Sequence, residues 1–480
     1  MEFQFVDNRT TLDRLSRKVI RSHVMKGKNR GKTIPARAQK RAPVQTSIHD
    51  MPRQRQGDIR ASELREEAKG TFSPFNPFAG TEYSYFAFPI QLTPPMRYMI
   101  YQFHSTVSET IYPHEFCRPS REVGSPWFKY MILDQTFLHC FFAMIASYIT
   151  LFHGHSDETL EAARHYSQTL RLVNRDLSTG DIPRDSTVAV VVSLAIEGNL
   201  SGAVHRSRIH LDGLQRIIEL RPGGLATLRE SNRGLMQKVC RTDIEFAMLD
   251  GMSTRFGLQR ASVCSAALPP SFGGSRVLAY LLTKICVPLQ YVTQDVLALC
   301  CCPGRVKLEA CHYQDAVISI CQRLLDFSPL GGVRPHDALD DAWQLGLLTF
   351  MTTILYRLGR LRLAYSELPL KLLQARLNDD SFAQVDEYRP LLFWLLFVYG
   401  FSALEGREGQ WLVPRIQALA NKLEAKTWED ANKCLNQFPW IGVVHDAPDQ
   451  THHKIVIAAD LILCSLVEDE KTFSVQRSGS

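Results

Sequence analysis

The chain has 480 residues, of which 45% are hydrophobic and 22% are charged, a composition typical of globular proteins. Its formal net charge is +6, but the first 60 residues carry 15 Lys/Arg against 5 Asp/Glu, so residues 61–480 are slightly acidic. No apolar run reaches the ~20 residues of a membrane span, and the chain begins without an apolar signal core. The 12 cysteines are scattered, which is typical of buried thiols in a reducing compartment. We therefore expect a soluble, intracellular protein.

Residues 1–60 form a basic amino-terminal tail, whose densest part, from Arg17 to Arg41, holds ten Lys/Arg and no acid. Residues 12–25 can form a short helix, but low hydrophobicity with high charge predicts disorder for most of the tail. Clustered charge in an extended chain suits a nuclear import receptor, and the same side chains can contact nucleic-acid phosphates without reading sequence. An inert solvated tail is the third interpretation. The candidate contact residues are Lys26, Lys28, Arg30, Lys32, Lys40 and Arg41.

Residues 61–93 form a linker rich in aromatic residues and proline. Seven Phe and Tyr side chains between residues 72 and 88 alternate with prolines, which forbid a helix there. This pattern predicts an extended strap docked on the helical body. A motif that binds a partner through its aromatic side chains is the alternative.

From residue 94 the apolar spacing becomes helical, and we predict an all-α domain over residues 94–470, followed by a disordered carboxy-terminus at 471–480. Thr93 is placed to cap the first helix and Pro94 to begin it. Two short loops, at Ala261–Ser275 and Ser328–Pro335, interrupt the domain without dividing it. Further helices are expected near residues 127–152, 157–177, 185–198, 203–221, 232–250, 276–301, 307–326, 337–366, 388–404, 411–424, 428–436 and 453–467.

The motifs of common metal and phosphate sites are absent from the sequence. No pair of cysteines has the spacing of a zinc module, and adjacent cysteines at Cys300–Cys302 point in different directions on a helix. Neither a glycine-rich phosphate loop nor a nucleophile elbow occurs. We expect no cofactor, no metal and no enzymatic activity.

Two acidic segments raise an alternative, in which carboxylates in a helical body hold magnesium for an isoprenoid-type reaction. The first segment reads D-x-x-D-D, reversed from the usual acidic order, and the second lacks a hydroxyl at the expected spacing. Helix capping and solvated faces explain both segments better. The residues concerned are Asp337, Asp340, Asp341, Asn378, Asp379 and Asp380.

Several motifs together resemble the fungal-specific transcription factor domain. The basic segment Ile20–Lys32 and the Asn76-Pro-Phe78 motif fit the amino-terminal pattern of that family. The segment 210–225, in which an H-x-x-G-L is followed by a glycine pair, and the segment 241–256 resemble its helical regulatory domain. The resemblance implies an all-helical regulatory body and a nuclear setting. The same residues also have a packing account, because Leu214 and its neighbours form an apolar stripe.

The chain departs from that family in its zinc module. Members usually carry an amino-terminal cluster of six zinc-binding cysteines, whereas the first cysteine here is Cys117. We therefore expect a nuclear, transcriptional regulator-like protein that lacks its own zinc module and acts through protein partners, as a homodimer or a heterodimer. An import receptor and non-specific nucleic acid are the expected partners of the tail, and no membrane is. A small-molecule enzyme or a ligand-sensing scaffold is the alternative.

Overall fold

The computed structural model describes residues 83, 85–103, 115–118, 126–153, 158–257, 275–303, 307–355, 367–402 and 409–445. Helices account for 76% of this part of the chain, and it contains no strand. An isolated parallel bridge joins Cys117 to Leu308. The expected all-α class is confirmed. The basic tail, the segment 61–82 and the helix expected near 453–467 lie outside the described residues.

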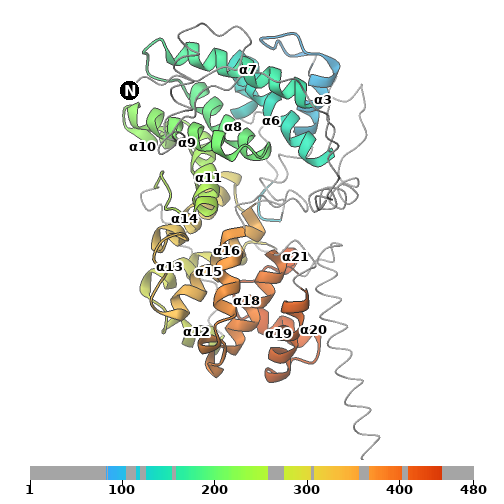
Figure 1. Ribbon diagram of the computed structural model, residues 1–480, viewed down its shortest axis with the longest axis vertical. Helices are drawn as coiled ribbons and strands as arrows, with labels where there is room; N and C mark the ends of the chain where they lie inside the picture. Colours follow the sequence, from blue (N-terminus) through green and yellow to red (C-terminus); the bar gives the residue numbers. More distant parts are fainter. Residues whose placement is uncertain are drawn as a thin grey trace, which may run out of the picture.

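The helices form two lobes that follow each other along the chain (Figure 1). In the amino-terminal lobe α6 packs against α3, α5, α7 and α8, and α8 in turn packs against α9. No helix in the described ranges is long and apolar enough to cross a membrane. The helices of this lobe are α3 (Pro94–Gln102), α5 (Pro126–Leu133), α6 (Gln135–His153), α7 (Glu158–Leu177), α8 (Asp185–Leu200), α9 (Val204–Leu220), α10 (Gly224–Ser231) and α11 (Arg233–Asp250).

The carboxy-terminal lobe is arranged around α15 and α18, whose residues are buried along almost their whole length. The two helices contact each other, α16 packs on both, and α19 and α20 cover α18. The elements of this lobe are α12 (Arg276–Leu282), α13 (Val287–Cys300), α14 (Ala310–Phe327), α15 (Ala338–Leu355), α16 (Glu367–Leu377), α17 (Asp380–Ala383), the 3-10 turn η5 (Asp386–Tyr388), α18 (Arg389–Ser402), α19 (Gly409–Lys422), α20 (Trp428–Leu435) and α21 (Gly442–His445).

Local signals in the sequence set several helix ends. Thr93 caps α3 by accepting a hydrogen bond from the backbone N–H of Met96, and proline begins that helix, as predicted. The single helix expected over 127–152 is instead two helices, because the Asp134 carboxylate accepts the N–H of Phe137 and starts α6 anew. The helix expected over 276–301 is likewise divided, with Pro288 in the first turn of α13.

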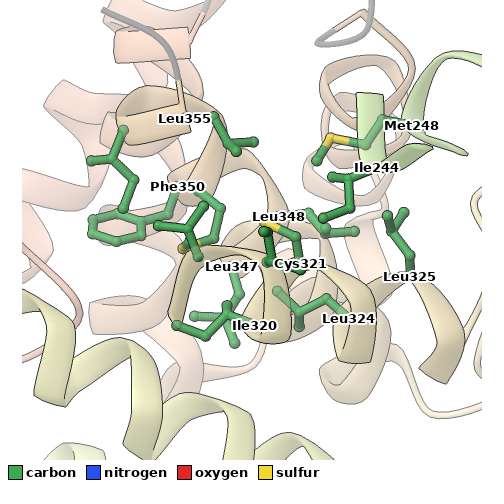
Figure 2. Packing of buried hydrophobic residues seen from close by; sticks show 14 of the residues in the cluster. Ile244, Met248, Ile320, Cys321, Leu324, Leu325, Leu347, Leu348, Phe350 and Leu355 are labelled. Atoms are coloured by element: carbon green, nitrogen blue, oxygen red, sulfur yellow. The ribbon is translucent and has the colours of Figure 1, made fainter. Parts of the chain in front are cut away.

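The lobes meet where α11 packs on α14 (Figure 1). Figure 2 shows Ile244 and Met248 facing the side chains of α14, whose other side faces Leu347 and Leu348 of α15. All these side chains belong to one hydrophobic cluster that runs through both lobes. The apolar face of α11 that contains Ile244 and Met248 is therefore buried, and it forms the joint between the lobes.

Close helix crossings in this core depend on glycine. A Cβ atom at Gly346 of α15 would lie 2.3 Å from Leu395 Cδ2 and 2.8 Å from Trp394 Cζ3 of α18, closer than real contacts allow. By contrast, a Cβ atom at Gly213 of α9 meets nothing within 4 Å, although the residue is buried. The glycine of the H-x-x-G-L motif is therefore not required for a close approach.

These two glycines make a matched pair of tests. We expect Gly346→Ala to lower the free energy of unfolding by about 1–3 kcal/mol, because the added methyl group forces α15 and α18 apart. Gly213→Ala should leave stability unchanged or raise it by up to about 1 kcal/mol, since alanine favours helix. Urea denaturation followed by circular dichroism measures both, and a destabilised Gly213→Ala would contradict the packing.

Candidate functional site

The residues predicted from the tail, Lys26 to Arg41, lie outside the described residues, so the candidate sites of the structure are in the helical body. Three groups of polar side chains are candidates: the predicted acidic segments, a buried cluster in the amino-terminal lobe, and the polar groups at the joint between the lobes.

The three aspartates of the first acidic segment have three separate partners. Asp337 accepts the backbone N–H groups of Leu339 and Asp340 (2.7 and 3.2 Å) and so caps α15. The carboxylate of Asp340 accepts the N–H of Cys286 at 2.9 Å. Asp341 is 3% exposed and forms ion pairs of 2.7 Å with both Arg334 and Arg376. The expected capping role is confirmed for Asp337. The expectation of a capping or solvated group is wrong for Asp341, which is a buried ion-pair centre.

The side chains of Asn378 and Asp379 in the second acidic segment also interact with helices, namely α19 and α16. Asn378 Oδ1 accepts hydrogen bonds from Trp411 and Arg415 of α19, both at 2.8 Å. Asp379 pairs with Arg376 at 2.9 Å, and Asp380 begins α17. Arg376 therefore bridges the two acidic segments. The described part of the chain contains no group of three or more His, Cys, Asp or Glu side chains that could hold a metal ion.

The Asp341 ion pairs give a direct test of a structural role. Asp341→Asn should cost about 3–5 kcal/mol of unfolding free energy, because it removes the counter-charge of Arg334 and one of the two carboxylates that pair with Arg376, and both guanidinium groups are largely buried. Asp386→Asn is the matched control, since the pair between Asp386 and Arg389 is exposed and should contribute less than about 1 kcal/mol. Equal losses in the two variants, measured by urea denaturation, would refute this assignment.

A chain of buried polar groups links four helices of the amino-terminal lobe. Glu197 of α8 accepts a hydrogen bond of 3.0 Å from Ser147 of α6, and it lies 3.7 Å from the guanidinium of Arg206 on α9. That guanidinium stacks over the ring of Tyr166 on α7, 4.7 Å from its centroid. The Tyr166 hydroxyl is 2.9 Å from His210 Nε2. The histidine of the H-x-x-G-L motif thus belongs to a network that holds α6, α7, α8 and α9 together.

Burial shifts the pKa values of this network towards the neutral forms. It raises the pKa of the Glu197 carboxyl, which the nearby Arg206 guanidinium and the Ser147 hydroxyl partly counteract. It lowers the pKa of His210 to about 4, and the charge of Arg206 acts in the same direction. His210 is therefore neutral at pH 7 and can share a hydrogen bond with Tyr166.

A second polar contact in this lobe joins two histidines. His139 Nδ1 of α6 and His165 Nδ1 of α7 are 2.8 Å apart, and His165 Nε2 lies 3.9 Å from the Glu161 carboxylate. The contact requires one ring to donate and the other to accept, which two protonated rings cannot do. Burial lowers the pKa of both histidines, that of His139 to about 4, with the charges of His165 and Arg171 contributing for His139.

This pair predicts a pH-dependent stability. Because the pKa of His139 is lower in the folded protein than in the unfolded chain, its contribution is complete above about pH 6.5. It is lost as the pH falls towards 4. We expect His139→Gln to flatten the dependence of unfolding free energy on pH in that window, while His312→Gln, at an exposed position, leaves it unchanged. An unaltered slope in His139→Gln, measured by urea denaturation from pH 4 to 7, would contradict the pairing.

A partly buried lysine completes the polar interior of this lobe. Lys238 Nζ of α11 lies 3.7 Å from the ring centroid of Trp127 and 3.4 Å from the Ser193 hydroxyl. Burial lowers the pKa of Lys238 to about 8. A serine beside a lysine can act as a nucleophile in hydrolases, but Ser193 is only 1% exposed. The pair therefore lacks the accessible nucleophile that such catalysis requires.

The joint between the lobes carries the third polar group. Arg233 of α11 pairs with Asp315 of α14 at 2.6 Å, and Arg241 donates to Gln314 at 2.6 Å. Asp243 accepts the backbone N–H groups of Arg255 and Phe256 at 2.6 and 2.9 Å, and burial raises the pKa of Asp243 to about 6.

Ion pairs connect the two segments that resemble the fungal domain. Arg255 pairs at 2.9 Å with Asp212, a residue of the H-x-x-G-L segment of α9. Asp250, from the end of α11, pairs with Arg208 of the same α9. Gly251 (φ 71°) caps α11 and accepts the N–H of Gly331 at 2.7 Å, which ties the loop at 328–335 to the amino-terminal lobe. The segments 210–225 and 241–256 are therefore connected directly by the ion pair between Asp212 and Arg255.

Sequence reasoning missed the buried network and the histidine pair. The sequence does contain single polar residues inside apolar helical runs, namely Glu197 and His139. Such residues usually find a hydrogen-bond partner nearby, so their presence alone does not predict a network. Comparison with protein-family models, with curated proteins and with solved structures found no match to this chain. The assignment of function therefore depends on the sequence motifs and on the geometry described above.

Proposed function

We propose that this chain is a nuclear, transcriptional regulator-like protein of the fungal transcription factor domain type, which acts through protein partners and has no zinc module of its own. The observation that carries the proposal is the separation of charge. The first 60 residues hold +10, whereas the rest of the chain is slightly acidic and, where described, is an all-helical body. In this proposal the basic tail is the targeting segment, and the helical body is the separate part that binds protein partners.

The helical body supports a regulatory role more than a catalytic one. Two of its carboxyl side chains, Asp341 and Glu197, are buried between helices and lie beside arginines. The aspartates considered for magnesium are engaged in capping, backbone contacts and ion pairs. The ion pair between Asp212 and Arg255 connects segments 210–225 and 241–256, which is consistent with the resemblance.

A ligand-sensing scaffold is the second candidate, and the buried network around Glu197 favours it. Four helices of the amino-terminal lobe meet at charged and polar groups whose protonation is shifted by burial. A ligand that altered this network would change the packing of α6 to α9. A screen for small molecules that raise the melting temperature of the wild-type protein but not of Glu197→Gln tests this candidate.

The regulator proposal is tested by localisation. Replacing Lys26, Lys28, Arg30, Lys32, Lys40 and Arg41 with alanine should abolish most of the nuclear enrichment of the tagged protein, because an import receptor reads clustered charge. Replacing Arg53, Arg55 and Arg60 is the control, since these residues lie outside the densest stretch, and it should have little effect. Continued nuclear accumulation of the first variant, in microscopy of the native cell, would contradict the proposed address.

A further inference from the structure

One helix of the body carries an exposed row of arginines. Arg164, Arg171 and Arg175 of α7 are exposed, and their spacing of 7 and 4 residues places them on one face of the helix. The opposite face packs against α6 and α8. Figure 1 shows α7 at the upper end of the molecule, on the side of the lobe away from the joint. The row therefore faces outward from a helix whose other face is packed against the lobe.

The positive charge of this row is only partly compensated by ion pairs. Within the part of the chain that the structure describes, Arg164 and Arg171 form no ion pair, and the hydrogen bond of Arg171 goes to the neutral Gln168. Arg175 lies 3.4 Å from Asp176, and this carboxylate also lies 3.4 Å from Arg184. Elsewhere in the body, arginines are typically paired at shorter distances, as Arg233 and Arg334 are.

The row has the chemistry and the dimensions of a phosphate contact. All three side chains are arginines, whose planar guanidinium groups bind phosphate in a bidentate manner. With a rise of about 1.5 Å per residue, Arg164 and Arg171 are separated by about 10.5 Å along the helix axis. This separation is close to the ~12 Å width of the B-DNA major groove, so the two side chains can reach phosphates on opposite strands. A-form RNA presents a deep and narrow major groove instead, which fits this spacing less well.

We propose that the Arg164–Arg171–Arg175 face of α7 is a docking surface for the phosphate backbone of duplex DNA. The surface lies in the helical body, so it goes beyond the proposed function, in which the tail is an import address and the body binds protein partners. It neutralises phosphates without reading bases. The tail brings the chain to DNA, and α7 fixes how the body is oriented on it.

The test is a DNA-binding titration of the full-length chain at several salt concentrations, with a labelled 20-base-pair duplex. The variant Arg164→Gln/Arg171→Gln/Arg175→Gln should bind about tenfold more weakly at low salt. It should also reduce the slope of log affinity against log salt by roughly 0.9 for each phosphate that is no longer neutralised. The control Arg118→Gln/Arg216→Gln/Arg276→Gln removes the same charge from dispersed exposed positions and should change the slope much less. Circular dichroism and thermal melting confirm that both variants are folded.

The same α7 variant is also made in the chain whose six tail residues are replaced with alanine, where the weakening should persist. Equal effects of the α7 and control variants would overturn the proposal, because net charge alone would explain them. Tighter binding of a labelled polyglutamate peptide than of the duplex would also overturn it, by assigning the face to an acidic protein. Nuclear enrichment of the α7 variant should be normal, so failure here is distinguishable from failure of the proposed import address.

Discussion

The contact between α11 and α14 is the interaction on which the rest of the structure depends. It joins two lobes that are otherwise built from helices close in sequence, and it combines an apolar centre at Ile244 and Met248 with polar pairs on either side. Apolar packing alone permits several registers between two helices, because ridges and grooves repeat along each of them. The pairs of Arg233 with Asp315 and of Arg241 with Gln314 can be made in one register only. Polar specificity inside an apolar contact thus fixes the orientation of the lobes.

The helical pattern of the sequence predicted the fold class and most of the long helices, because amphipathic spacing directly reflects which face is buried. It failed where a single side chain decided the outcome. Asp134 restarts a helix within an apolar run, and the Gly223–Gly224 pair opens α10, a helix that was not expected. The Asp341 ion pairs could not be predicted, since Arg376 comes from a helix 35 residues further along the chain. Such contacts depend on the tertiary arrangement, which periodicity does not describe.

The buried polar groups raise the question of why a helical body retains them. Apolar replacements are often as stable as a buried ion pair, so stability alone does not account for Glu197 beside Arg206. Both groups lie near the short turn between α8 and α9, where Gly198 and Ser207 are in close contact. A charged pair at that point favours one packing of the two helices over its neighbours. The same reasoning applies to the joint, so polar groups in both lobes act to define the arrangement of helices around them.

The distribution of charge on the surface follows from this interior. Where arginines are engaged by buried carboxylates, they leave no charge for an external partner, as in the Arg334–Asp341–Arg376 group. The arginines of α7 differ because the inner face of that helix is supplied mainly by histidine, tyrosine and apolar side chains. Among the described residues, only Arg175 of the three has a carboxylate within ion-pair distance, that of Asp176. His165 and Arg164 are adjacent in sequence, yet one is buried against His139 and the other is exposed. A helix whose buried face contains neutral polar groups can therefore present a basic face that its own interior does not neutralise, and the proposed contact of α7 with duplex DNA depends on this asymmetry.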